Sequence, residues 1–323
     1  MYDIITIGDT TVDVFLDIDE STALCALDAK KEWLRLRYGS KIPVKHVKKI
    51  VGVGNAANVA VGVQRLGLKT AIYTVLGDDA KGREIQKKFL SLGIDTAYIA
   101  VDRDTDTNLS TVIDYQGDRT ILVHHEERTY RLPTFAPTKW IYFSSICGNH
   151  DAFNRALARL ARQKKIRLGF NPGSMQLRLG AKRLAPILAA TEVIFLDMQE
   201  AERLTRKTSD IKQLLRAVKK LGPKIVAITD GRRGSYCFDG EKMYQIGIID
   251  LPVLERTGCG DAYASGFVAA LLYGLPVTQA MRWGSANGAH EAVDFGSQSG
   301  ILTKVEIEEL LRRHSHFQPR AVD

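Results

Sequence analysis

The chain has 323 residues, of which 45% are hydrophobic and 25% charged, and this is enough sequence for one large α/β domain or two smaller ones. Its four cysteines lack a C-x-x-C pair and its apolar runs are too short to cross a bilayer, which argues against a disulfide framework, a zinc cage and a membrane span; we expect a cytoplasmic protein with no membrane partner. The net charge of +8 could suit a nucleic-acid surface, but the basic residues are interleaved with acidic ones on predicted polar faces, so we expect no nucleic-acid partner.

The predicted elements alternate between strand and helix, a pattern typical of a parallel sheet covered by helices. The first apolar run ends at Gly8 and Asp9 and is predicted to be a strand. Residues 70–77 form the next strand of this kind, followed by a helix that begins at Asp78 or Asp79 and ends at Gly93. Further buried strands are predicted at residues 139–146, 166–172, 192–197 and 224–230, with helices such as 151–165 and 209–222 between them. Thr303 and Glu306 form a capping box before a last helix.

Two regions interrupt this alternation and predict a small inserted β-sheet. Residues 109–115 and 119–126 alternate around a Gln116-Gly117-Asp118 turn, which is the pattern of an antiparallel hairpin. Residues 11–50 contain short strand-like pieces and a stretch of helical character at 27–38. The predicted fold class is therefore a three-layer α/β/α, doubly wound, mostly parallel sheet in a single domain over residues 1–323, with a lid formed roughly by residues 11–50 and 96–127.

The loop at residues 51–60 raises the question of a dinucleotide. Gly52, Gly54 and Ala57 have the G-x-G-x-x-A spacing, and a helix and a strand follow, as in an NAD(P)-dependent dehydrogenase. Such a loop should follow a buried parallel strand, whereas residues 43–51 alternate lysine with apolar residues like a half-exposed strand. A dehydrogenase that uses this loop therefore remains a minor alternative.

A second glycine-rich stretch, residues 256–267, predicts an anion site. Gly258, Cys259 and Gly260 precede a run that is apolar on nearly all sides, so a buried helix should begin near residue 260 and end at Gly274. Its first N–H groups and dipole favour an anion such as phosphate. Asp261, in the first turn, either caps the helix or takes the proton from a hydroxyl that attacks a phosphoryl group.

Taken together, the two glycine-rich stretches resemble the signatures of the ribokinase/PfkB family of carbohydrate kinases, over nearly the whole chain. The first signature is carried by five residues, Gly54, Asn58, Ala60, Gly67 and Gly77, and the second by the sequence ERTGCGDAYASGF. The resemblance implies that Asp13, Gly52, Gly54 and Asn58 bind the acceptor sugar. It also implies that Gly258, Cys259 and Gly260 hold the transferred phosphate as an anion hole, with Asp261 as the general base.

The same resemblance implies a nucleotide and a metal site. Thr229, Gly231 and Gly234 match the family's nucleotide loop for ATP, and Ser285 or Asn287 would border the adenine. Asp197 and Glu200 match its N-x-x-E element and would hold Mg²⁺, mainly through water. Without the resemblance, Asp197 and Glu200 could equally mark an exposed helix start.

The chain departs from the family pattern at Val53, which bears on the identity of the acceptor, and at Glu255-Arg256, which bears on a monovalent-cation (K⁺) site. The departure at Cys259 should change little, because backbone N–H groups bind the anion. We expect ATP-dependent phosphorylation of a hydroxymethyl group on a small sugar, with a nucleoside kinase of the same fold as the alternative. The resemblance also implies that a homodimer could form through the lid. The sequence does not name the acceptor.

Overall fold

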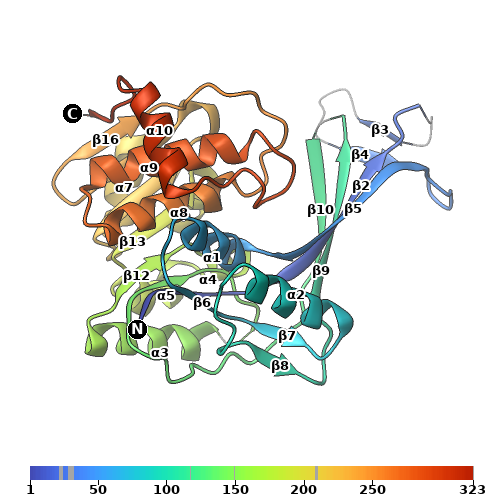
Figure 1. Cartoon of the computed structure of the whole chain (residues 1–323), viewed down its shortest axis with the longest axis horizontal. Helices are drawn as coiled ribbons and strands as arrows, with labels where there is room; N and C mark the ends of the chain where they lie inside the picture. Colours follow the sequence, from blue (N-terminus) through green and yellow to red (C-terminus); the bar gives the residue numbers. More distant parts are fainter. Residues whose placement is uncertain (22–24, 28–32, 117, 149, 208–209, 323) are drawn as a thin grey trace.

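The chain forms one large sheet with a long parallel section, as the sequence predicts (Figure 1). The structure is a computed structural model and describes residues 1–21, 25–27, 33–116, 118–148, 150–207 and 210–322. In spatial order the strands are β6 (Thr70–Tyr73), β1 (Tyr2–Ile7), β11 (Thr138–Phe143), β12 (Arg167–Phe170), β13 (Val193–Asp197), β14 (Ile225–Thr229), β15 (Ser235–Phe238), β16 (Met243–Ile246) and β17 (Arg320–Ala321). Neighbours from β6 to β14 run parallel, and the last three strands continue the sheet antiparallel. The carboxyl ends of the parallel strands therefore share one edge, where open α/β sheets bind ligands.

Helices cover both faces of the large sheet. One face is covered by α3 (His150–Lys164), α4 (Ser174–Leu179), α5 (Ala181–Leu188), α6 (Met198–Thr205) and α7 (Ile211–Lys219). The other is covered by α1 (Asn55–Arg65), α8 (Cys259–Leu272), α9 (Val277–Glu291) and α10 (Lys304–Arg313). The layer order confirms the predicted three-layer class.

The predicted buried helix is α8, which packs between α1 and α9 and is buried along most of its length. It begins at Cys259 and ends before Gly274, whose φ of 79° is one that glycine adopts without strain. The predicted capping box at the start of α10 is also confirmed, because the Thr303 side chain accepts from the Glu306 N–H and the Glu306 carboxylate accepts from the Thr303 N–H.

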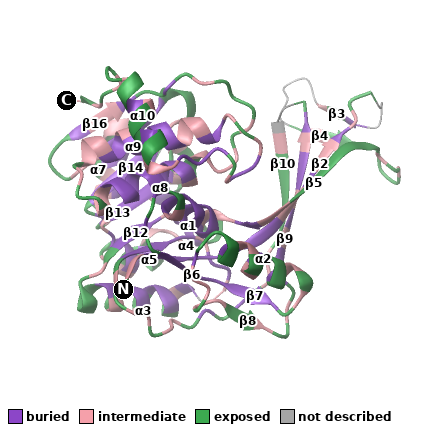
Figure 2. Ribbon diagram, viewed as in Figure 1, coloured by how far each residue is buried: buried purple, intermediate pink, exposed green. Residues whose placement is uncertain are grey.

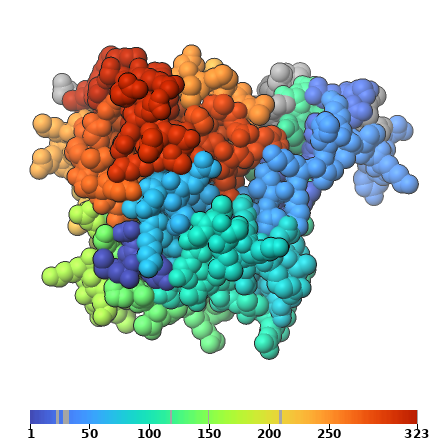
Figure 3. All heavy atoms as spheres, in the orientation of Figure 1, coloured from blue at the N-terminus to red at the C-terminus, as the bar shows by residue number. Residues whose placement is uncertain are grey.

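A second, four-stranded sheet, called here the projecting sheet, stands away from the rest of the molecule (Figures 1 and 3). Its order is β10 (Asp118–His124), β9 (Asn108–Tyr115), β2 (Thr11–Ile18) and β5 (Val44–Val53). The predicted hairpin is confirmed by the antiparallel pairing of β9 with β10, although Gly117 of its turn lies outside the described residues. Figure 2 shows β5 as largely exposed, whereas β2 and β9 keep buried residues at their far ends, where Ile18, Cys25, Ile113 and Tyr115 form a small cluster.

Two local expectations need correction. The stretch predicted to be helical at 27–38 contains strand β4 (Leu34–Leu36), which pairs with β3 (Cys25–Leu27), while residues 28–32 lie outside the described residues. The single strand predicted at 70–77 is divided, because β7 (Val75–Gly77) leaves the large sheet to pair with β8 (Ala100–Asp102). Residues 100–102 thus belong to a separate strand pair and not to the projecting sheet.

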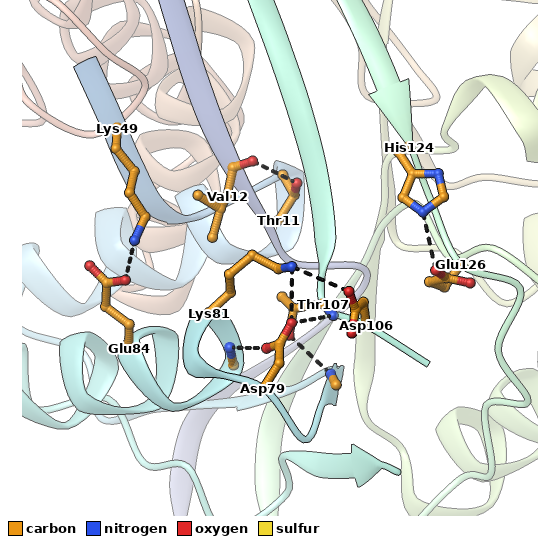
Figure 4. A network of polar contacts seen from close by, with 12 residues as sticks. Thr11, Val12, Lys49, Asp79, Lys81, Glu84, Asp106, Thr107, His124 and Glu126 are labelled. Atoms are coloured by element: carbon orange, nitrogen blue, oxygen red, sulfur yellow. Dashed lines mark hydrogen bonds and ion pairs between the residues drawn. The ribbon is translucent and has the colours of Figure 1, made fainter. Parts of the chain in front are cut away.

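Helix α2 (Ala80–Ser91) fixes the base of the projecting sheet (Figure 4). Its N-cap is Asp79, whose Oδ1 accepts from the Gly82 N–H and from the Thr107 hydroxyl, both at 2.7 Å. Asp79 Oδ2 accepts from the Thr107 N–H at 3.0 Å, immediately before β9 begins. An ion pair between Lys49 of β5 and Glu84 adds a second link. Both strands are therefore tied to one helix.

Among the residues that the structure describes, no helix is long and apolar enough to cross a membrane.

Candidate active site

Polar residues gather where the parallel strands end. Asp9 follows β1, Asn171 follows β12, Asp197 ends β13 and Thr229 ends β14. The parallel register brings these positions to one edge of the sheet, facing the first turns of the helices that follow. The sites predicted for the acceptor, the metal and the nucleotide thus lie along the same edge.

The loop before α1 requires glycine at two positions. Gly52 has a φ of 64° and Gly54 a φ of 114°, and a Cβ on Gly54 would lie 2.7 Å from the carbonyl oxygen of Asp9. The loop follows β5, which belongs to the projecting sheet and pairs antiparallel with β2. A Rossmann loop would follow a buried parallel strand of the main sheet, so the geometry does not support the dehydrogenase alternative.

Asn58 joins this loop to α8. It lies in the first turn of α1, is 4% exposed, and its Nδ2 donates to Asp261 Oδ2 at 2.8 Å, although the two residues are 203 positions apart. Helix α8 has no side-chain cap, so Asp261 does not serve as its cap; the partner of its carboxylate is Asn58. The two glycine-rich stretches therefore meet at one carboxylate.

The electrostatic setting of Asp261 suits proton transfer. Burial raises the pKa of Asp261 from 3.8 to about 6, and the hydrogen bond from Asn58 partly opposes this rise. The carboxylate is therefore ionised at neutral pH, with a basicity well above that of an exposed aspartate. This is the range in which a general base is effective.

The N-terminus of α8 has the geometry expected of an anion hole. Gly258 is left-handed, with φ 85°, and a Cβ there would lie 2.7 Å from Ser297, so glycine is required. A Cβ on Gly260 would meet open space, which leaves its backbone accessible. The Cys259 N–H makes one long bond of 3.4 Å to the Arg256 carbonyl oxygen. Burial, with Glu291 and Glu255 nearby, raises the pKa of the Cys259 thiol to about 12, so the thiol adds no negative charge beside an anion.

A cavity of about 480 Å³ extends from this helix terminus. Its lining includes two of the predicted anion-hole residues and four of the predicted nucleotide residues: Cys259, Gly260, Thr229, Gly231, Gly234 and Ser285. Gly231 begins the short 3₁₀ helix η1 (Gly231–Arg233), whose Arg232 also lines the cavity. Asn287 does not line this cavity. It is fully buried, and its Nδ2 donates to the Ala262 carbonyl oxygen and to Ser265 Oγ, so it braces α9 against α8.

Asp197 and Glu200 cap α6 reciprocally. Asp197 Oδ1 accepts from the Glu200 N–H at 2.7 Å, and Glu200 Oε2 accepts from the Asp197 N–H at 2.9 Å, which is the helix-start role that the sequence left open. The second oxygen of each carboxylate takes no part in this pair. Burial, together with the Asp197 carboxylate, raises the pKa of Glu200 to about 7. In the described part of the chain no group of three His, Cys, Asp or Glu side chains could hold a metal directly, so a metal here would need water ligands.

Asp13 lies on β2 beside Ser110 of β9, inside the projecting sheet near its base. Burial raises the pKa of Asp13 to about 6, while a hydrogen bond with Ser110 lowers it. Its Oδ1 is buried and has no hydrogen-bond partner among the described residues. A buried carboxylate oxygen of this kind fits a ligand hydroxyl.

Several residues of this region were not predicted from the sequence. Asp9 is 7% exposed, accepts from the Tyr130 hydroxyl and lies 3.6 Å from His125 Nδ1, measured from its Oδ2. Asn55 Nδ2 donates to Asn171 Oδ1 at 2.8 Å and ties α1 to the edge of the sheet. A signal existed for Asp9 and Asn171, since both directly follow predicted strands, but none existed for Tyr130 or His125, which come from a loop and the end of the hairpin.

Glu255 lies where the chain departs from the family pattern that bears on a K⁺ site, and its carboxylate accepts from protein donors. Arg119 of β10 pairs with Glu255 Oε1, which also accepts from the Thr257 N–H at 2.7 Å, and Oε2 accepts from the Gly296 N–H at 3.3 Å. Glu255 thus connects the projecting sheet to the loop before α8.

Comparisons with known proteins agree with this geometry. Residues 18–304 match the model of the pfkB family carbohydrate kinase. A nucleoside kinase of Methanothermobacter thermautotrophicus is 25% identical over 304 residues, covering 93% of this chain and 92% of its own. A 5-dehydro-2-deoxygluconokinase of Shouchella clausii is 27% identical over 284 residues, covering 81% and 86%. The structure of Arabidopsis thaliana ribokinase complexed with ribose and ATP superposes with a TM-score of 0.79 at 20% identity, covering 96% of this chain and 99% of the other. The chain therefore belongs to the PfkB family and is a kinase of the sugar and nucleoside type.

Proposed function

We propose that the protein transfers the γ-phosphoryl group of ATP to a hydroxymethyl group of a small sugar. The observation that carries this proposal is the 2.8 Å hydrogen bond between Asn58 and Asp261. It connects the segment before α1 at residues 51–54, called here the acceptor loop, with the helix terminus beside the nucleotide cavity. The nucleoside alternative is kept because a nucleoside kinase is among the relatives that align over most of the chain.

In the proposed reaction the Asp261 carboxylate accepts the proton of the acceptor hydroxyl. The hydroxyl oxygen bonds to the γ-phosphorus, while the bond between this phosphorus and the departing oxygen of ADP breaks. The N–H groups of Gly258, Cys259 and Gly260 stabilise the charge that spreads over the three equatorial oxygens. Gly52, Gly54, Asn58 and Asp13 orient the acceptor. The residues at the edge of β13 fit a water-mediated metal: Mg²⁺ bound near Asp197 and Glu200 would supply positive charge against the nucleotide phosphates.

The cavity suits the donor side of this reaction. Thr229, Gly231, Gly234 and Ser285 line it and would contact an adenine nucleotide, and Gly260 of the predicted anion hole lines the same cavity. Asn287 is left out of the proposed nucleotide contacts, since its amide is engaged in packing. A K⁺ requirement has weaker support, because the Glu255 carboxylate already accepts from protein donors.

We further infer that the projecting sheet closes over the acceptor and forms a homodimer interface. Exposed apolar side chains on β5 and β10 support the second part; they are Val44, Val47, Ile121, Leu122 and Val123. A monomeric mass in light scattering would contradict the proposed homodimer and would not affect the proposed reaction. Cytoplasmic location stays a prediction.

The decisive test replaces Asp261 by Asn. Loss of a general base costs about 10²- to 10⁴-fold in turnover, and nucleotide affinity should persist because the backbone N–H groups remain. ADP release is measured across a panel of sugars and nucleosides, and nucleotide binding by calorimetry. Asp104→Asn is the matched control, because it makes the same chemical change at an exposed position between β8 and β9. Turnover equal to wild type in Asp261→Asn would contradict the assignment.

A further inference from the structure

A chain of hydrogen bonds runs from α2 to the carboxylate of Asp261. Lys88 Nζ donates to Gln298 Oε1 at 2.6 Å, Gln298 Nε2 donates to Asn58 Oδ1 at 2.8 Å, and Asn58 Nδ2 donates to Asp261 Oδ2 at 2.8 Å. These residues come from α2, the loop after α9, α1 and α8. The contacts therefore cross four separate elements of the fold.

The two ends of this chain determine the direction of every bond in it. An ammonium group can only donate and an ionised carboxylate can only accept, whereas each amide has one end of each kind. With Lys88 at one end, the oxygen of Gln298 must face α2, so its NH₂ group faces Asn58. The oxygen of Asn58 is then occupied, and its NH₂ group is directed at Asp261.

Lys88 also braces the acceptor loop. Its ammonium donates to the Val51 carbonyl oxygen at 2.6 Å, and Gln298 Nε2 donates to the Gly52 carbonyl oxygen at 2.8 Å. One cation thus connects the loop that precedes Gly54 with the loop at 297–298. Ser297 Oγ, from the same loop, gives a second donor to Asn58 Oδ1 at 3.2 Å.

The position of Lys88 is itself fixed, because its helix begins at the Asp79 cap (Figure 4). Burial lowers the pKa of Lys88 to about 8, so the side chain remains mainly an ammonium at neutral pH. In the part of the chain that the structure describes, Glu200 of α6, Glu291 of α9 and Tyr142 of β11 interact electrostatically with Asp261. Among the described residues, Lys88 is the cation at the other end of the hydrogen-bond chain that reaches Asp261.

We propose that Lys88 is a positioning residue for phosphoryl transfer: through Gln298 it fixes the amide of Asn58 in the orientation that donates to Asp261, and it holds the acceptor loop in register with that carboxylate. This inference rests on the proposed function, because it assumes that Asp261 is the general base. It adds a role for α2, which contributes no residue to the nucleotide cavity.

The test compares Lys88→Met with Lys87→Met. Both variants remove one positive charge from α2, but Lys87 is exposed. In Lys88→Met, loss of the oriented donor should raise the pKa of Asp261, so the acid limb of the pH profile of kcat/KM should move to higher pH by about one unit. The plateau kcat should fall about tenfold. Nucleotide affinity should not change in either variant, and Lys87→Met should keep the wild-type profile.

Gln298→Met provides a second, uncharged break in the same chain. It should shift the acid limb as Lys88→Met does, and the double variant should shift it no further, because residues that act through one path are not additive. If Lys88→Met does not fold, Gln298→Met alone decides the matter. An acid limb at the wild-type position in a folded variant, or additive shifts, would overturn the proposal.

The proposed function and the positioning role of Lys88 can be refuted separately. If Asp261→Asn keeps wild-type turnover, the proposed function itself is wrong. If Asp261→Asn is inactive while Lys88→Met and Gln298→Met behave as wild type, Asp261 remains the base and only the role of Lys88 is lost.

Discussion

Replacing Asp261 by Asn should make the protein more stable while it removes activity. Burial raises the pKa of this carboxyl from 3.8 to about 6, so between these pH values the folded protein binds more protons than the unfolded chain. Wild-type stability therefore falls as the pH rises through this window, and the full penalty is present above pH 6. The amide of Asp261→Asn carries no charge, so the variant avoids this desolvation penalty.

The size of the effect follows from the two pKa values. A difference of about two pKa units corresponds to about 3 kcal/mol at pH 8, and to about half of that at pH 5, where the folded carboxyl is largely protonated. Asp261 is half-buried and keeps some contact with solvent, which reduces both figures, so we expect Asp261→Asn to gain about 2 kcal/mol at pH 8 and about 1 kcal/mol at pH 5.

Urea unfolding followed by circular dichroism at the two pH values measures this difference, with Asp104→Asn as the exposed control. The gain should be larger at pH 8 than at pH 5, and the control should show none. If Asp261→Asn is no more stable than wild type at pH 8, or if its gain in stability does not depend on pH, burial of the charged Asp261 carboxylate does not cost the free energy that we infer.

Two further changes follow from the same structure. Burial alone would raise the pKa of Asp79, but hydrogen bonds from the Gly82 N–H and from Thr107 outweigh it and hold the pKa well below its usual range. Asp79→Asn should therefore destabilise the protein by about 2 kcal/mol at pH 7 in urea unfolding, and the loss should shrink below pH 4; an equal loss at both would contradict the ionic origin. Gly258→Ala places a Cβ 2.7 Å from Ser297 at a left-handed φ, so kcat should fall at least tenfold in the ADP-release assay; wild-type kcat would show that the anion hole tolerates this distortion.

The sequence was most informative where a local pattern decides the structure. The buried helix after Gly258 could be predicted because its apolar residues have no polar side, and the β9–β10 hairpin because its strands alternate around a short turn. The stretch at 34–36 was mistaken for helix because Leu34 and Leu36 gain their strand conformation from pairing with β3, which local propensity does not encode.

The candidate site was predictable in parts but not as an arrangement. Asp261, Asn58 and the glycines around them lie in two short motifs, so their chemistry could be inferred from spacing and resemblance. Asn287 could not be separated from Ser285, because the two lie near each other on one helix and only packing shows which faces the cavity. Lys88 and Gln298 gave no signal at all, since they come together only through contacts of 210 residues in sequence separation.

Helix α2 acts at both of its ends. The cap at Asp79 holds the root of β9, and nine residues later, about 14 Å along the axis, Lys88 supports Val51 and Gln298. Under the proposed closure of the projecting sheet, we expect a movement of its base to be transmitted through helix α2 to the amide beside Asp261. Acceptor binding should therefore change the hydrogen bonding of the Asp261 carboxylate through the contacts of Lys88.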